Sequence, residues 1–166
     1  MSQRASVTVP VPADELFSWL RDVGSWPDLL QGLAGVDDLG YHRYRWTVVF
    51  GGEPETCDVV ITADPVARRI SWKHLRGRPF DGSFRLTPQD GRTVVELSID
   101  VKPVGLAEGI ADFTNHGSAM AETDARRLYD AVEAWAALRH QRADAADPDV
   151  VDAGRTPRPS DGEAVG

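Results

Sequence analysis

The sequence predicts an α+β domain in which a curved antiparallel sheet of six to seven strands wraps around one long C-terminal helix, with two short helices near the N-terminus. Short segments between residues 41 and 101 alternate apolar and polar residues and are separated by turns rich in Gly and Pro. From about Leu106 to Arg142 the apolar residues recur at helical spacing instead. Proline and acidic residues mark a helix start before the first of these strands.

An edge strand and two short helices are expected in the N-terminal part. Ser6–Val11 alternates valine with small or imino residues, and its proline restricts such a strand to an edge. Residues 12–15 open a helix, because proline suits the first turn and the acids favour the positive end of the helix dipole. Gly24 ends this helix, Trp26–Leu30 begins a second one, and a brief strand follows at Val36–Leu39.

The middle of the chain is a series of hairpins. Strands are expected at Tyr41–Phe50, Glu55–Ala63, Arg69–Leu75, Gly82–Thr87 and Arg92–Val101. Short turns join them, and Gln89-Asp90-Gly91 is a strong hairpin signal. Successive strands joined in this way form an antiparallel meander with one apolar face.

A long helix with one apolar stripe follows the strands. The stripe contains Ile110, Phe113, Gly117, Met120, Asp124, Leu128, Ala131, Trp135 and Leu138. A helix of about thirty residues is roughly 45 Å long, which is enough to cross a sheet. Beyond it, the residues from Ala143 to Gly166 show no periodicity, and six acids against two arginines give them a net charge of −4. We therefore expect one domain at residues 1–142 and a disordered acidic tail at residues 143–166.

Composition excludes several classes of function. The chain of 166 residues has a net charge of −8 and shows no basic footprint for nucleic acid. Cys57 is the only cysteine, so no intrachain disulfide can form. The first residues lack a signal-like apolar segment and no run of eighteen apolar residues occurs, so we expect a cytoplasmic protein without a membrane span. The four histidines lack metal-ligand spacing, and no cofactor motif is found.

The order of elements predicts a container. A helix about 10 Å wide cannot evenly fill the concavity of a twisted sheet, so either bulky side chains fill the gap or a cavity remains. The residues available for filling are Tyr44, Trp46, Phe50, Trp72 and Phe84. A solid core without a ligand is the alternative, because protein interiors normally pack closely.

Four segments, within a stretch of about residues 5–140, resemble the START-like (SRPBCC) superfamily, and within it the polyketide cyclase/dehydrase and coenzyme Q-binding protein group. They are Val9–Phe17, Val23–Leu30, Ile70–Leu75 and Val101–Pro103. The resemblance implies a helix-grip fold with a pocket between sheet and helix for polyketides, quinones, sterols or other lipids. It also implies that cyclases of this group hold a basic residue, often Arg, in the pocket. This sequence departs from that pattern, because no Arg, Lys or His occurs between Arg45 and Arg68.

The inward-facing positions supply the candidate ligand-binding residues. They are Trp26, Tyr44, Trp46, Val48, Val59, Ile61, Trp72, His74, Phe84, Leu97, Ile99, Phe113 and Met120. An aromatic-rich inward face with few ionisable groups favours binding or carriage of a hydrophobic small molecule. The alternative is an enzyme, a polyketide cyclase, aromatase or dehydratase acting on a poly-β-keto intermediate.

Three residues are candidates for the proton transfers of such an enzyme. His74 is in phase with Ile70 and Trp72 and has an imidazole suited to acid–base work, although a hydrogen-bonded histidine at the rim is the alternative. Asp124 lies on the apolar stripe, where a carboxylate either has a raised pKa or pairs with a nearby arginine. Tyr44 can donate a hydrogen bond to a ligand carbonyl or simply pack in the core.

Further positions could contact a ligand or partner. Trp26 and Pro27 occupy the place of a pocket mouth or of a structural wedge, and Asn115 and His116 lie near the expected entrance. Arginines at 76 and 78 could attract an acidic or acyl-carrier-linked substrate, although loop arginines are usually solvated. A homodimer and an interaction module that acts through the acidic tail are further alternatives.

Overall fold

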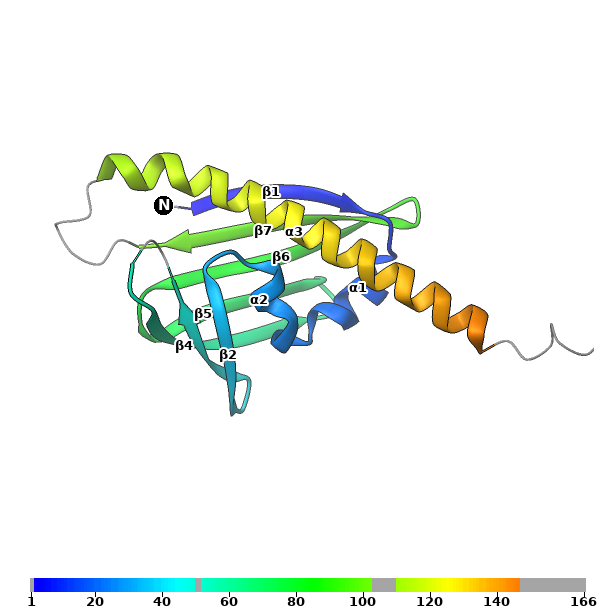
Figure 1. The fold of residues 1–166 in the computed structure, drawn as a ribbon, viewed down its shortest axis with the longest axis horizontal. Helices are drawn as coiled ribbons and strands as arrows, with labels where there is room; N and C mark the ends of the chain where they lie inside the picture. Colours follow the sequence, from blue (N-terminus) through cyan, green and yellow to red (C-terminus); the bar gives the residue numbers. More distant parts are fainter. Residues whose placement is uncertain (1, 50–51, 103–109, 147–166) are drawn as a thin grey trace, which may run out of the picture.

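The computed structural model describes residues 2–49, 52–102 and 110–146, with the side chains of the last helix described from Met120 onward. The sheet has seven antiparallel strands in the order β1-β7-β6-β5-β4-β3-β2, and one long helix, α3, lies on it (Figure 1). The strands are β1 (Ser2–Val9), β2 (Leu33–Gly40), β3 (Arg43–Val48), β4 (Glu55–Asp64), β5 (Arg69–Gly77), β6 (Phe80–Gln89) and β7 (Arg92–Val101). The helices are α1 (Ala13–Leu20), the 3₁₀ turn η1 (Val23–Ser25), α2 (Trp26–Leu29) and α3 (Ile110–Ala145). The predicted α+β helix-grip fold is confirmed.

The predicted edge position of the first strand is confirmed, whereas its predicted bounds, Ser6–Val11, are wrong because the strand spans Ser2–Val9. β1 is an edge strand paired only with β7, and it ends at Val9, directly before Pro10. Proline has no N–H for the ladder, so a strand interior could not contain it. At the other end of the chain, α3 continues to Ala145, three residues past the expected end at Arg142. Residues 147–166, most of the expected tail, lie outside the described residues, as does the expected helix start at Leu106.

Helix α3 runs along β1 and past α1 (Figure 1). Its buried face carries two small residues and two branched ones, Ala121, Ala125, Leu128 and Val132. The alanines allow a close approach to the strands. Further along, the rings of Trp19 from α1 and Trp135 stack with their centroids 5.3 Å apart. The second half of α3 is therefore anchored to α1 as well as to the sheet.

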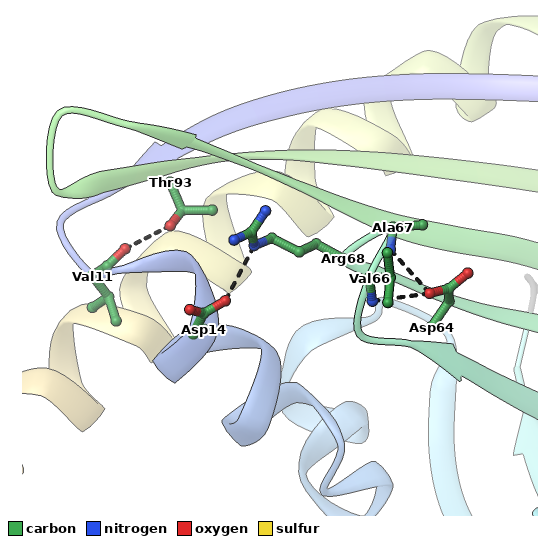
Figure 2. Close-up of polar contacts among 7 residues, drawn as sticks. All are labelled: Val11, Asp14, Asp64, Val66, Ala67, Arg68 and Thr93. Atoms are coloured by element: carbon green, nitrogen blue, oxygen red, sulfur yellow. Dashed lines mark hydrogen bonds and ion pairs between the residues drawn. The ribbon is translucent and has the colours of Figure 1, made fainter.

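Polar contacts fasten the start of α1 to one end of the sheet (Figure 2). The Thr93 hydroxyl donates a hydrogen bond to the carbonyl of Val11 over 2.7 Å. The Arg68 guanidinium contacts the carboxylate of Asp14 at 3.1 Å. Arg68 lies in the β4–β5 turn, where Asp64 Oδ1 accepts hydrogen bonds of 3.0 and 2.9 Å from two backbone N–H groups. These contacts determine where α1 and the segment after it meet the strands.

The middle of the concave face is filled by five aromatic rings, which we call the aromatic cluster. Its members are Trp26, Trp46, Trp72, Phe80 and Phe84, each at most 1% exposed. Neighbouring ring centroids lie 5.2 to 6.0 Å apart, mostly edge to face, as quadrupoles prefer. A Cβ at position 82 would overlap the Trp72 ring, so this ring requires Gly82. In this part of the sheet the interior is closed by side chains, as the solid-core alternative expects.

Candidate functional site

Open space adjoins the aromatic cluster at the end of the sheet where the β2–β3 hairpin approaches α1 and η1. A cleft of about 610 Å³ lies there. It is lined by Leu20, Arg21, Val23, Tyr41, His42, Tyr44, Val60, Ile61, Thr62, Ala63 and Ile70. One wall therefore comes from the end of α1 and from η1, and the other from β3, β4 and the start of β5. Its volume falls in the range of small-molecule sites, about 300–1,000 Å³.

The helical wall is held rigid by its own short-range hydrogen bonds. Trp26 Nε1 donates to the carbonyl of Leu20 over 2.9 Å, which ties the end of α1 to the aromatic cluster. The Asp22 carboxylate accepts the N–H of Gly24 at 3.2 Å. Leu20 and Val23 are buried, whereas Arg21 between them is exposed. The wall thus offers the cleft apolar surface and one guanidinium.

The turn between β2 and β3 forms the outer edge of the cleft. Gly40 pairs with Arg43, so only Tyr41 and His42 make the turn. Their φ angles are +54° and +60°, the left-handed region at both central positions that a type I′ turn requires. Tyr41 is 93% exposed. We call these two residues the lip; the hairpin that carries them projects away from α3 (Figure 1).

The side chains that line the cleft are electrostatically unlike the rest of the protein. The whole chain has 26 acidic residues against 18 Lys and Arg. The lining nevertheless contains Arg21 and His42 and no Asp or Glu. Burial, and then the nearby carboxylates of Asp38 and Asp22, raise the pKa of Tyr44 above its ordinary value. The Tyr44 hydroxyl therefore stays protonated at neutral pH and is available as a hydrogen-bond donor.

The predicted ligand-binding residues fall into distinct environments. Two of them line the cleft, Tyr44 and Ile61. Four belong to the aromatic cluster, Trp26, Trp46, Trp72 and Phe84. Five pack in or against the remaining core, Val48, Val59, Leu97, Ile99 and Met120. The side chain of Phe113 lies outside the described set, as do those of Asn115 and His116.

His74 is half-buried and does not line the cleft. The β5–β6 ladder stops at the pair Trp72 and Gly82, and Asp81 enters the gap that follows. Its Oδ1 accepts the backbone N–H of His74 at 2.7 Å and lies 2.7 Å from the ring Nδ1. The carboxylate replaces a ladder partner and orients the imidazole. No sequence pattern indicates Asp81, because its role arises from a break in strand pairing.

Asp124 is 1% exposed and has no arginine as its hydrogen-bond partner in the described part of the chain. Its Oδ1 instead accepts the backbone N–H of Gln31 over 2.6 Å. Within the described residues Oδ2 is buried without a hydrogen-bond partner. Burial raises the pKa of Asp124 to about 7, against the opposing effects of the Gln31 N–H and of Arg127. The carboxylate fastens α3 to the turn after α2 and lies outside the lining of the cleft.

Arg78 is buried, contrary to the expectation of a solvated loop arginine. Its side chain is 5% exposed, and Nη1 lies 3.3 Å from Oε1 of Glu55. The chain turns inward here at Gly77, whose φ is +83° and where a Cβ would overlap the carbonyl of Thr56. Arg76 remains exposed. Sequence spacing cannot separate these two arginines, because the difference depends on the glycine conformation between them.

The fold is the helix-grip fold of START superfamily proteins. The chain belongs to the family described as polyketide cyclase/dehydrase and lipid transport, whose pattern matches residues 2–139. No curated protein matches it. Within the described residues no helix combines the length and apolar character of a membrane span. No cluster of His, Cys, Asp and Glu side chains suited to a metal occurs in the same residues.

Solved structures share the fold. A protein from Deinococcus radiodurans is 26% identical, with 78% of this chain and 95% of that chain covered and a TM-score of 0.62. A START superfamily protein from Mycobacterium smegmatis is 18% identical, with coverages of 81% and 98% and a TM-score of 0.68. An aromatase/cyclase from a Streptomyces species is 21% identical, with coverages of 80% and 93% and a TM-score of 0.58. At these identities, the last two show likeness of fold alone.

Proposed function

We propose that the protein binds a hydrophobic small molecule of the polyketide, quinone or lipid-like class in the cleft between α1–η1 and strands β3–β5. The observation that carries this proposal is the cleft of about 610 Å³ with its mixed lining. Leu20, Val23, Ile61 and Ile70 offer apolar surface, and Tyr44 offers a hydroxyl donor. The family, which includes lipid transport, supports the same class of ligand.

The energetics of the cleft favour an apolar ligand with one polar anchor. Burial of about 200 Å² of apolar ligand surface contributes about 5 kcal/mol. Association costs at least about 4 kcal/mol in lost translation and rotation. The two terms nearly cancel, so affinity depends on additional contacts. A hydrogen bond from the protonated Tyr44 hydroxyl adds about 1 kcal/mol and fixes the orientation of a carbonyl.

Filling the cleft tests the proposal. Ala63 lines the cleft but is exposed, so Ala63→Trp occupies the space without disturbing the core. We expect this variant to lose at least about tenfold in affinity for menadione, a naphthoquinone, in calorimetric titrations. Val66→Trp is the matched control, because Val66 is 90% exposed in the β4–β5 turn and does not line the cleft. Equal binding by the two variants and the unmodified protein would overturn the proposal.

A cyclase or dehydratase is the second candidate, favoured by the presence of both His42 and Tyr44 in the lining. Enolisation of a β-keto substrate needs a base and a donor to the carbonyl oxygen, and an imidazole and a phenol can supply them. The other predicted catalytic residues, His74 and Asp124, do not line this cleft. The test is the rate at which an acetoacetyl thioester exchanges its α-protons in deuterated water. If His42→Gln exchanges these protons at the same rate as the unmodified protein, this activity is contradicted.

We also propose that the ligand of this cleft can be an acyl-carrier-linked substrate. An acyl-carrier-linked substrate requires a site that opens to solvent, and the exposed lip provides such an edge. A homodimer and a cytoplasmic location remain predictions from the sequence. Sedimentation velocity tests the first, with a mass near 18.1 kDa as the outcome that contradicts it.

A further inference from the structure

Two hairpins of the sheet are each closed by two residues with positive φ and have very different turn sequences, and in the first of them Gly40 also has a φ of +80° next to a register shift in the ladder. In the β2–β3 hairpin, Gly40 pairs with Arg43 and the lip lies between them. In the β6–β7 hairpin, Gln89 pairs with Arg92, and Asp90-Gly91 lies between them. Both residues of each turn have positive φ, +54° and +60° in the first and +50° and +76° in the second.

The conformation suits one of these sequences and not the other. Glycine adopts positive φ without steric cost, and Asp tolerates it better than most residues, so Asp90-Gly91 fits a type I′ turn. A tyrosine with positive φ is an outlier, because its Cβ crowds the following carbonyl. Turn chemistry alone therefore favours Asp-Gly or Asn-Gly at both places. The lip nevertheless consists of Tyr41 and His42.

Packing within the protein does not compensate for the cost of the lip. Tyr41 is 93% exposed and His42 is exposed as well. Within the described residues, neither side chain makes a hydrogen bond, an ion pair or a ring contact. Both nevertheless line the cleft. Strained residues at the edge of a cleft, with side chains that the fold itself does not use, point to contact with a ligand.

We propose that the lip is the specificity element of the cleft and that it selects a planar, ring-containing ligand bearing a carbonyl or acidic oxygen. This inference rests on the proposed binding function. The exposed Tyr41 ring provides a face on which a flat ring system stacks. His42, Arg21 and Tyr44 provide donors for the oxygen, and no carboxylate lines the cleft to repel it.

The two carboxylates that act on Tyr44 do not alter this choice of ligand. Asp22 and Asp38 each accept a backbone N–H, from Gly24 at 3.2 Å and from Gly40 at 2.7 Å. They stabilise the backbone of the two cleft walls rather than facing its interior. Burial, and then their charge, raises the pKa of Tyr44, so the phenol stays a donor toward an oxygen acceptor. An aliphatic chain without a ring would use neither the stacking face nor this set of donors.

Exchanging the turn sequences tests the inference. The double variant Tyr41→Asp/His42→Gly gives the lip the sequence of the other turn. We expect its melting temperature to rise by about 2–4 °C, because the strain is removed. We expect its affinity for menadione to fall about tenfold, while its affinity for decanol changes less than about twofold. The reciprocal variant Asp90→Tyr/Gly91→His is the matched control, with a lower melting temperature and unchanged affinity for menadione.

Single substitutions separate ring from backbone. Tyr41→Phe keeps the stacking face and is expected to keep the affinity for menadione. Tyr41→Asn removes the backbone strain of the turn but lacks the ring, so we expect it to lose that affinity. Unchanged menadione affinity in the double variant overturns the inference, and the Ala63→Trp result then shows whether binding in the cleft itself still stands. An equal loss of menadione and decanol binding also overturns it, because the lip would then act without selectivity for rings.

Discussion

Two neighbouring regions of the concave face are built on the same strands and have opposite characters. On β3, Trp46 is fully buried in the aromatic cluster, whereas Tyr44, two residues before it, lines the cleft. On β5, Trp72 likewise belongs to the aromatic cluster, whereas Ile70, two residues before it, lines the cleft. Strand alternation places all four on one face but says nothing about what covers them. The difference comes from Trp26, which enters from the helical segment and closes one region only.

The side chains of the aromatic cluster are covered by the protein, whereas those of the lip and Tyr44 are open to the cleft. The rings of the aromatic cluster lie 5.2 to 6.0 Å from one another, so each ring is covered by its neighbours. The lip and Tyr44 have surface that the protein leaves open. Substitutions in the first region should therefore change the free energy of unfolding, and substitutions in the second should change affinity.

The largest expected effect is that of Trp72→Ala. The ring packs on Gly82 and on four other rings, so its removal leaves a cavity and costs about 3–5 kcal/mol of unfolding free energy. Urea unfolding measures the loss. Trp19→Ala, at the partly buried stack between α1 and α3, is the control and should cost less. A loss below about 1 kcal/mol for Trp72→Ala would contradict the closed character of this region.

Asp124 should make stability depend on pH in a third region, between α3 and the turn after α2. Burial raises the pKa of this carboxyl from 3.8 to about 7 in the folded protein, so the unfolded chain binds fewer protons between about pH 4 and 7. Stability then falls as pH rises through this interval and is level above it. At about 1.4 kcal/mol per pH unit, the loss amounts to at most about 4 kcal/mol.

The variant Asp124→Asn tests this dependence. Asn keeps an oxygen that can accept the Gln31 N–H and has no charge to bury. Its unfolding free energy should lack this decline and exceed that of the unmodified protein at pH 8. Asp130→Asn, at an exposed position on the same helix, serves as the control. Parallel pH profiles for the unmodified protein and Asp124→Asn would show that the carboxyl does not titrate in this range.

Exchanging the two turn sequences should change the free energy of unfolding by a smaller amount. Asp90→Tyr/Gly91→His should cost about 2 kcal/mol, because two residues with side chains are then held at positive φ. Tyr41→Asp/His42→Gly should stabilise the protein by about 1 kcal/mol. Chemical denaturation of both variants gives the values. If both exchanges destabilise the protein, the lip contributes to folding. The two hairpins would then not differ in how well their turn sequences suit positive φ.

Local pattern was sufficient for the fold and insufficient for the site. Alternation placed the strands, and proline placed β1 at an edge. The predicted strand Tyr41–Phe50 is wrong at its start, since Tyr41 lies in the turn before β3. An aromatic residue at the head of an alternating run favours a strand, and only the paired backbone reveals the positive φ. The partner of Asp124 lies 93 residues away along the chain, at Gln31. Such contacts depend on how elements dock, which periodicity does not encode.

The smallest effect, and the sharpest test of the open region, is that of Tyr44→Phe. Loss of the hydroxyl should reduce the affinity for menadione by about threefold to tenfold, the value of one hydrogen bond of about 1 kcal/mol. Unfolding free energy should change by less than about 1 kcal/mol, because the ring remains. Since burial and two carboxylates raise the pKa of this phenol, the affinity of the unmodified protein should not fall between pH 8 and 9. A decline toward pH 9, or equal affinity of Tyr44→Phe, would remove Tyr44 as the donor and leave the cleft with apolar contacts and the lip.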